Sequence, residues 1–399
     1  MSLNVLTELL DLPQVRVIGY ELPDAERLIL DIDICMPIAT CPTCGEVSTA
    51  VHSYVKRRTV RDLDVWGRQC YLRFVPRQFK CQHCQDTFVE RLPWLGARRH
   101  QTHRFEEQVY KLVCRTNVTA AAIHYHLSAD RVASIFERLA THRVLARGYP
   151  LVRVLNVDEI APYKGHGNYR LVLSSPEVGV LDVLEDRHKA TFEAWLDARG
   201  PEWCAAVQEF HADMWRPYHE VARGCLPNVH VTTADHFHVI KNLTKALGEI
   251  RKAIQRQADT ATRETLKGSR WLLLKNSEQL SETEREQLEA LLQAVPELAH
   301  NYNLKEDFRA IYALRDPQEA AHQLEHWLVK AETTGHTALK SFITTVKNWR
   351  AEILSFFTSR GSNAFAEGVN NKIKLVLRRA FGCPNFAHFR LRIIVAFSP

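Results

Sequence analysis

The chain has 399 residues, of which 46% are hydrophobic and 25% charged, a composition typical of a folded protein with room for two or three domains. No apolar run approaches the length of a membrane span, and the first residues lack the basic-then-apolar build of a secretion signal. We therefore expect a cytoplasmic protein without membrane contact. Ten cysteines, four of them in two CxxC pairs, favour metal binding over a disulfide framework.

The net charge of +6 is unevenly distributed along the chain. Residues 41–115 carry 14 Lys/Arg against 7 Asp/Glu, and six further bases with no acid follow Glu367. Two basic segments around a more acidic middle are typical of a protein that binds a polyanion, with nucleic acid the first candidate. Charge alone leaves a solvated basic surface as the alternative.

The first section, residues 1–95, is predicted to be β-rich, with strands at 15–22 and 28–34. Two CxxC pairs follow, and each pair can hold two thiolates close together in a tight turn, so that two pairs complete a tetrahedral site. The spacing predicts a zinc ribbon with one structural zinc ion, whose ligands are Cys41, Cys44, Cys81 and Cys84.

The cysteine pairs leave two further points open. Cys35, Cys70 and His83 are possible substitute ligands, although their spacing fits less well and ordinary packing explains each of them. The alternating residues of 57–79 predict a hairpin that carries the second cysteine pair and turns its basic side chains toward DNA.

Residues 96–150 read as a small helical section. Helices are expected at 104–116 and 120–127, and Ser128 occupies the N-cap position of a third helix. Three short helices with a tight turn predict a helix-turn-helix whose third helix lies in the DNA major groove, with Arg131, Ser134 and Arg138 on or near its exposed face. Any small helical bundle gives this pattern, so the adjacent basic zinc ribbon is what favours DNA binding.

Residues 151–238 alternate between strand-like and helix-like runs, which predicts an α/β fold. Acidic residues at the ends of neighbouring strands suit two-metal phosphoryl chemistry, because magnesium prefers hard oxygen ligands. Asp158 ends the first expected strand and Asp213 the fourth. Because successive side chains on a strand point to opposite faces, Asp158 and Glu159 cannot both enter one site.

Other acids compete for the same role. Asp235 ends a further strand beside His236 and His238, and is either a rival second carboxylate or a residue that supports the site from behind. Weaker claims belong to Asp182, Glu185 and Asp186 near the end of the third strand. The two histidines read as structural residues.

Residues 239–360 carry helical apolar spacing throughout, with helices expected at 240–256, 281–295, 320–332 and 339–357. They predict an all-α section without strands. A last helix is expected after Ser362, within the final section at 361–399.

Four segments of the sequence resemble the ISL-three family of insertion-sequence transposases. They are VDEIAPYKGHGNY, HADMWRPY, DHFHVIKNL and SNAFAEGVNNKIKLVLRRAFGCPNFAHFRLRI, and the resemblance covers essentially the whole chain. It implies a DDE catalytic core of RNase H-like fold in which Asp158, Asp213 and Glu367 hold two catalytic magnesium ions. The gap of 154 positions between Asp213 and Glu367 is too long for one crossover connection, which independently requires the helical insertion.

The resemblance implies a transposase that binds the terminal inverted repeats of its element, cleaves double-stranded DNA and transfers the strand to a target, as a homo-oligomer on DNA. Bases after Glu367 are expected to contact the phosphate backbone, namely Lys372, Lys374, Arg378 and Arg379. A basic exposed helix face is the alternative for these four residues. Two other functions stay open: a DNA-binding regulator derived from a transposase, and an RNase H-like nuclease without strand transfer.

Overall fold

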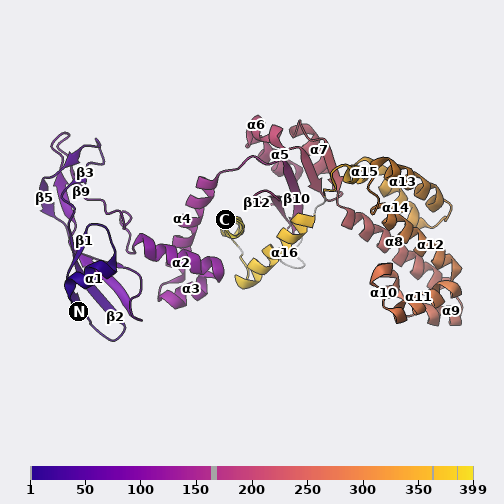
Figure 1. The fold of residues 1–399 in the computed structure, drawn as a ribbon, viewed down its shortest axis with the longest axis horizontal. Coiled ribbons are helices and arrows are strands. Elements are labelled where there is room, and N and C mark those ends of the chain that lie inside the picture. Colours follow the sequence, from indigo (N-terminus) through magenta and orange to yellow (C-terminus); the bar gives the residue numbers. More distant parts are fainter. Residues whose placement is uncertain (1, 163–168, 362–363, 384, 399) are drawn as a thin grey trace. The chain divides into compact units, whose positions relative to one another are not determined.

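The computed structural model describes residues 2–162, 169–361, 364–383 and 385–398. The chain forms two compact units, Met1–Arg143 and Val144–Pro399, which are described one at a time (Figure 1). Among the described residues, no helix combines the length and the apolar character needed to cross a membrane.

A four-stranded sheet forms the first part of the N-terminal unit. Its strands occur in the order β1-β2-β7-β6, with bounds β1 Val15–Glu21, β2 Arg27–Ile34, β6 Arg58–Arg61 and β7 Gln69–Phe74. Helix α1 (Leu3–Leu10), which we did not predict, packs its buried leucines into the same core. The hairpin predicted within 57–79 is present as β6 and β7, but the prediction that it carries the second cysteine pair is wrong. Strand β7 also pairs with β2, so this hairpin extends the N-terminal sheet.

The second cysteine pair is carried by a different hairpin. Five short strands surround the cysteines: β3 Ala39–Thr40, β4 Val47–Ser48, β5 Val51–Tyr54, β8 Arg77–Lys80 and β9 Thr87–Val89. The pairs β3-β4 and β8-β9 are antiparallel hairpins, and each has one cysteine pair in its turn. Phe79 and Phe88 stack beneath the cysteines and form a small core of their own.

Three helices complete the N-terminal unit: α2 (His103–Arg115), α3 (Val118–Tyr125) and α4 (Ala129–Arg147). Their starts follow from the sequence, because the side chains of Thr102 and Asn117 accept hydrogen bonds from the first turns of α2 and α3. The Ser128 hydroxyl accepts a hydrogen bond from the Arg131 N–H at 3.3 Å, as its N-cap position predicted.

A mixed five-stranded sheet forms the centre of the second unit, in the order β12-β11-β10-β13-β14. The strands are β10 Val154–Ile160, β11 Arg170–Ser175, β12 Gly179–Leu184, β13 Glu209–Ala212 and β14 Val231–Ala234. Strands β10, β11 and β12 pair antiparallel, whereas β10, β13 and β14 pair parallel. Strand β10 continues two residues beyond Asp158, which therefore lies inside the strand and not at its end.

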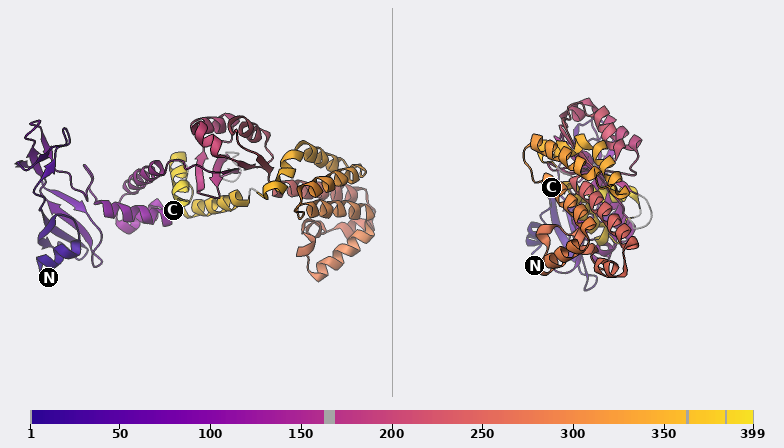
Figure 2. Two further views of the ribbon diagram at one scale, coloured as in Figure 1. Left: turned by 45° about the horizontal axis from the view of Figure 1, so that its top comes forward. Right: turned by 90° about the vertical axis from the view of Figure 1, so that its right-hand side faces the viewer.

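Helices cover both faces of this sheet. On one face, α5 (Lys189–Asp197), α6 (Gly200–Ala206) and α7 (Arg216–Cys225) pack on side chains such as Leu171 and Leu173. On the other, α16 (Ala364–Arg379) and α17 (Phe386–Ala396) pack on Val172 and its neighbours, and the views of Figures 1 and 2 agree on this arrangement. Because successive side chains alternate across β11, one strand contributes to both cores.

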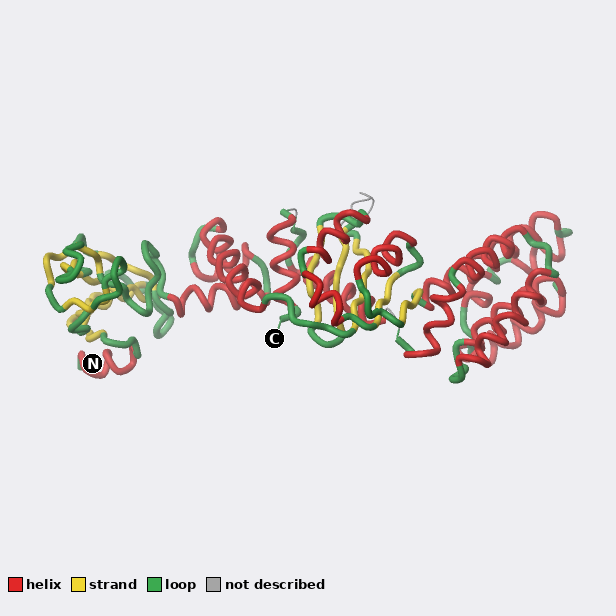
Figure 3. Tube along the Cα trace, turned by 90° about the horizontal axis from the view of Figure 1, so that it is seen from above, coloured by secondary structure: helices red, strands yellow, loops and turns green. Residues whose placement is uncertain are grey.

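Only helices are found among the described residues between β14 and α16, as the tube in Figure 3 makes visible. They are α8 His236–Gln257, α9 Thr260–Leu266, α10 Arg270–Leu274, a 3-10 turn at Ser277–Gln279, α11 Glu282–Ala294, α12 Pro296–Ile311, α13 Pro317–Glu332, α14 Thr337–Asn348 and α15 Arg350–Ser359. The single helix expected at 339–357 is in fact two, α14 and α15, which meet at the buried Trp349.

The helical segment joins the sheet at its parallel edge. Helix α8 begins directly after β14, and α15 returns to it, where the Thr232 N–H donates a hydrogen bond to the Ser355 hydroxyl at 3.2 Å. The chain then reaches α16. This segment therefore separates β14 from α16 in sequence but returns the chain to the same sheet.

Candidate functional site

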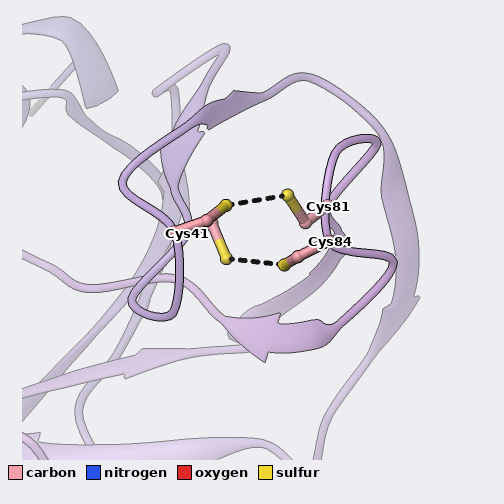
Figure 4. A group of neighbouring side chains, drawn as sticks. Cys41, Cys81 and Cys84 are labelled. Atoms are coloured by element: carbon pink, nitrogen blue, oxygen red, sulfur yellow. Dashed lines mark hydrogen bonds between the residues drawn. The ribbon is translucent and has the colours of Figure 1, made fainter.

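The four cysteines of the CxxC pairs converge on one point. The Sγ atoms lie 3.6 Å apart for Cys41 and Cys84 and 3.5 Å for Cys44 and Cys81, and all four lie within 4.8 Å of one another (Figure 4). Four sulfurs bound tetrahedrally at about 2.3 Å from a zinc ion would lie roughly 3.8 Å apart. The donor set therefore fits one zinc ion with no position left open for a substrate.

The two cysteine turns have the same backbone geometry. The N–H groups of Cys41 and Cys81 donate to the carbonyls of Glu46 and Asp86, each at 2.8 Å. Burial raises the pKa of the Cys41 thiol, but the backbone N–H groups around it outweigh this effect and lower that pKa to about 6. The pKa of the Cys84 thiol shifts the other way, because burial and the neighbouring thiols outweigh the lowering effect of the Asp86 N–H and raise it. Only part of this cluster therefore ionises easily to the thiolate, which is the form that binds metal.

The alternative zinc ligands lie apart from this cluster. Cys70 is fully buried in β7, where burial raises the pKa of its thiol to about 12. Cys35 is exposed, and its Sγ lies 3.9 Å from the Asp33 carbonyl oxygen. His83 sits within the second cysteine turn but does not belong to the group of close ligand atoms.

In the second unit, strand register aligns three aspartates. Val157 of β10 pairs with Ala212 of β13, and Ala212 pairs with Ala234 of β14, all in parallel. The next residues along the three strands are Asp158, Asp213 and Asp235. Parallel strands therefore place three carboxylates in one row along one edge of the sheet.

His238, on the first turn of α8, connects two of these carboxylates. Its Nδ1 lies 2.9 Å from an Asp213 oxygen and 2.9 Å from an Asp235 oxygen. These two carboxylates raise the pKa of His238 to about 10, so the imidazole carries a positive charge near neutral pH. The other Asp235 oxygen accepts a hydrogen bond from the Phe237 N–H at 3.2 Å and caps the helix.

Asp158 lies on the other side of Asp213. One of its oxygens accepts a hydrogen bond from the Glu159 N–H, and the other accepts one from the Asn370 side-chain amide, both at 2.7 Å. Burial, and after it the negative charge of Asp213, raises the pKa of Asp158 to about 7. Carboxylates that hinder one another's ionisation in this way make a site that favours a cation.

Glu367 lies on the first turn of α16, one turn before Asn370, and its side chain is exposed. It belongs to none of the groups of close ligand atoms, and in the part of the chain that the structure describes its carboxylate forms no hydrogen bond or ion pair. The structure thus places Asp158 beside Asp213 on neighbouring strands and Glu367 on the helix that contacts Asp158. The close group of ligand atoms consists of Asp213, Asp235 and His238, and it contains neither Asp158 nor Glu367.

The remaining acids have structural partners. Glu159 faces away from Asp158 and binds Arg187 at 3.0 Å and the Tyr218 hydroxyl at 2.8 Å. Asp182 is buried and held by Arg390 on α17. Glu185 lies 3.7 Å from Arg170, and Asp186 accepts a hydrogen bond from the His188 N–H before α5.

The predicted DNA contacts on α4 have different environments. Arg131 and Ser134 are exposed on one side of the helix. Arg138 is only one-third exposed and binds the buried Glu106 carboxylate of α2 at 2.5 Å. Its first role is therefore to pair with a buried acid, and a DNA contact would have to compete with this ion pair.

The four predicted bases on α16 are all exposed: Lys372, Lys374, Arg378 and Arg379. The opposite side of the helix packs on the sheet through residues such as Ile373 and Leu377. Lys372 also lies 4.2 Å above the ring of Phe397. Other bases of the C-terminal segment serve the fold, since Arg392 is buried and Arg390 binds Asp182.

Two residues of the carboxylate site escaped sequence reasoning. His238 was interpreted as structural, although its position three residues after Asp235 places both at the start of one helix. Asn370 was not considered, although it lies three residues after Glu367 and therefore on the same side of α16. In both cases, the spacing of three residues from a candidate carboxylate would have pointed to the residue, because residues three apart lie on the same side of a helix.

Comparison with known proteins agrees with this architecture. A transposase family profile of the ISL3 group matches residues 155–393, a zinc-finger profile of the transposases of IS204, IS1001, IS1096 and IS1165 matches residues 38–84, and the helix-turn-helix profile of transposase family ISL3 matches residues 90–140. The zinc ribbon and the helix-turn-helix predicted from the sequence are thereby confirmed.

Individual relatives match along most of their length. The transposase for insertion sequence element IS1001 of Bordetella parapertussis is 29% identical over 363 residues, which is 90% of this chain and 89% of the relative. The transposase for IS1557 of Mycobacterium tuberculosis is 26% identical over 369 residues, covering 86% and 82%. With the zinc ribbon, the helix-turn-helix and the transposase domain all matched in this order, the chain belongs to the ISL3 family of transposases.

Proposed function

We propose that this chain is a DDE transposase that binds the terminal inverted repeats of an insertion sequence, cleaves the DNA there and joins the freed end to a target. The observation that carries the proposal is the row of aspartates on three parallel strands, with α16 packed beside it through the hydrogen bond from Asn370 to Asp158. The mixed sheet with helices on both faces supports an RNase H-like core interrupted by the helical segment.

Asp158, Asp213 and Glu367 would hold two magnesium ions. The fit rests on donor chemistry, because carboxylate oxygens are the ligands magnesium prefers, and on the raised pKa of Asp158, which a bound cation would relieve. When bound, the ions supply an activated water and a positive charge opposite the leaving oxygen of the phosphodiester. Glu367 would turn its exposed side chain toward the aspartates once DNA and metal are present.

The neighbouring side chains would hold the ligands in position. Asn370 fixes one Asp158 oxygen, and His238 bridges Asp213 and Asp235. Asp235 is tied to the helix N-terminus as well, so it serves as a positioning residue behind Asp213. Hydrolysis at the element end breaks the bond between phosphorus and the 3′ oxygen and leaves a 3′-OH and a 5′-phosphate. That hydroxyl then attacks a phosphodiester of the target and displaces the target's own 3′ oxygen, so no covalent enzyme intermediate is needed.

The remaining parts of the chain would bind DNA. The zinc ribbon and the helix-turn-helix, with Arg131 and Ser134 exposed on α4, would recognise the element ends, and the exposed bases of α16 would contact phosphates near the carboxylate site. Because an insertion sequence has two ends, we expect at least two copies of the chain to act together on DNA.

The test is Glu367→Gln, which keeps the size of the side chain and removes its charge. DNA cleavage at the element's own terminal repeats in magnesium should fall by roughly a thousandfold or more, as expected when a metal ligand is lost. Binding of the same DNA in a gel-shift assay should persist. Glu159→Gln is the matched control, since Glu159 binds Arg187 and Tyr218 instead of facing the aspartates, and should cost far less.

If Glu367→Gln cleaved the repeats at the wild-type rate, the DDE assignment would fail. If the wild-type protein bound the repeats but did not cleave them under any assay condition, it would instead be a DNA-binding regulator.

A further inference from the structure

A groove of about 690 Å³ runs along α8 in the helical segment, between that helix and α10. One end is lined by His236 and Phe237, the two residues that directly follow Asp235. From there the groove continues past Lys241 and Lys245 to Lys252 and Arg270. Its end at His236 and Phe237 therefore follows Asp235 directly in sequence, although none of the three aspartates lines it.

The lining of this groove is basic. It contains six Lys/Arg and a single carboxylate, Glu249. Lys252 binds Glu249 at 2.8 Å, and Arg309 binds Glu278 at 2.6 Å. Within the described residues, Lys241 and Lys245 are exposed and form no salt bridge. Their charges are thus available to an anionic ligand.

Helical spacing gives the groove a continuous floor. Phe237, Lys241, Lys245, Gly248 and Lys252 follow one another at intervals of three or four residues, so they form one stripe along α8. At 1.5 Å per residue, this stripe is roughly 22 Å long. Glycine is unfavourable inside a helix, yet Gly248 has open space where a side chain would be. A floor without a side chain allows a ligand to approach the helix closely.

An exposed aromatic side chain lies at the end of the stripe that is nearest to Asp235 in sequence. Phe237 is 49% exposed, although it neighbours the buried Asp235. A positively charged groove with an exposed aromatic side chain is the arrangement that binds single-stranded nucleic acid, because phosphates pair with the bases and a nucleobase stacks on the ring.

We propose that this groove binds an unpaired DNA strand as it leaves the carboxylate site, with a base stacked on Phe237 and phosphates held by Lys241 and Lys245. The inference rests on the proposed function and adds a strand-binding site within the helical segment. A volume of this size matches pockets that hold one drug-sized molecule, which suits a few nucleotides of a single strand.

The test measures binding of a fluorescent twelve-nucleotide oligothymidylate to the full-length, zinc-loaded protein. The double variant Lys241→Ala/Lys245→Ala should bind it at least tenfold more weakly. Because each phosphate contact to a single strand contributes a slope of about 0.7, the plot of log affinity against log salt should become shallower by roughly 1.4. Phe237→Ala should weaken binding by about fivefold or more, the lower end of what base stacking contributes. Gly248→Leu should block the groove and also lower affinity.

Arg315→Ala/Lys340→Ala is the matched control because it removes two exposed bases of the same segment that lie outside the groove and, within the described residues, form no salt bridge. It should leave affinity unchanged. Wild-type binding by the groove variants, or an equal loss in the control, would overturn the proposal. Asp158→Asn should bind the oligothymidylate normally, so loss of strand binding and loss of cleavage report on the groove and on the carboxylate site separately.

Discussion

The zinc site and the carboxylate site both consist of side chains that can bind metal ions, but they are built in different ways. Each cysteine pair lies within one tight turn, and the two turns have the same backbone hydrogen bonds. Asp158, Asp213 and Asp235 instead belong to three strands or directly follow them, and Asp158 and Asp235 are separated by 77 positions. A site formed within turns can be predicted from spacing, whereas a site formed across strands depends on their register.

The two sites also differ in their surroundings. The cysteine cluster is complete in itself, while Asp158, Asp213 and Asp235 depend on Asn370 and His238 for their hydrogen bonds. Four sets of substitutions, in order of decreasing expected effect, would test how far each region depends on local contacts and how far on the rest of the fold.

Cys44→Ser or Cys81→Ser should have the largest effect. Structural zinc contributes roughly 10–16 kcal/mol to the folding of small zinc domains. Either variant should therefore lose zinc, unfold the strands around the cysteines and weaken sequence-specific DNA binding. Metal analysis of the purified protein and a gel shift would measure both effects. Freshly purified wild-type protein without bound zinc would contradict the assignment of the four cysteines as zinc ligands.

Asp182→Asn tests a buried carboxylate that had only a weak claim to the metal site in the sequence analysis. Arg390 binds both of its oxygens, at 2.6 and 2.9 Å, and the Tyr149 hydroxyl and the Trp195 indole donate to it at 2.6 and 2.9 Å. Breaking a buried ion pair from one side costs about 3–5 kcal/mol. Thermal or urea unfolding should show this loss, whereas Asp186→Asn on the neighbouring loop should change stability far less.

The Asp182 effect should depend on pH. Despite the opposing effect of burial, Arg390 and the other donors hold the pKa of Asp182 below its ordinary value. The stabilisation is therefore fully present above about pH 4 and is lost as the pH falls through the lowered pKa. The stability difference between wild type and Asp182→Asn should shrink in acid, and a difference that stayed constant down to pH 2 would argue against the ion pair as its cause.

Asp235→Asn distinguishes a positioning residue from a metal ligand. Loss of a residue that orients a ligand typically costs 10–100-fold in metal affinity or activity. The magnesium concentration for half-maximal cleavage should rise by that factor, while Asp213→Asn should abolish cleavage at any magnesium concentration. Equal loss in the two variants would make Asp235 a ligand and put Asp213 in doubt.

Two glycines provide the smallest and most local comparison. Gly248→Ala adds a methyl group in open space within a helix, so it should stabilise the protein by about 0.5–1 kcal/mol. Gly361→Ala would place its methyl group against the buried His211 ring and should destabilise by about 1–3 kcal/mol. Urea unfolding of both variants would measure the two changes in stability. A change of the same sign in both variants would contradict the idea that the local contacts at each glycine determine the effect.

Much of the fold followed from periodicity and capping. The strands β1 and β2, the helices α2 to α4 and the helices α8, α11 and α13 lie where alternation, caps and 3.6-residue spacing predicted them, whereas α9, α10 and α12 were not predicted individually. The errors concern which strands pair with one another and where helices are interrupted. Strand β7 pairs with β2, and Trp349 separates α14 from α15, because strand pairing and buried side chains are properties of the folded chain.

The sequence by itself determined the zinc ligands, because two residues of a CxxC turn are held together by the local backbone whatever the rest of the chain does. It also supplied the family resemblance and candidate carboxylates. Only the tertiary structure decided which acids meet: the parallel register of β10, β13 and β14 aligns Asp158, Asp213 and Asp235, and α16 brings Asn370 to Asp158. These contacts join residues up to 212 positions apart, and no local spacing encodes a distance of that kind.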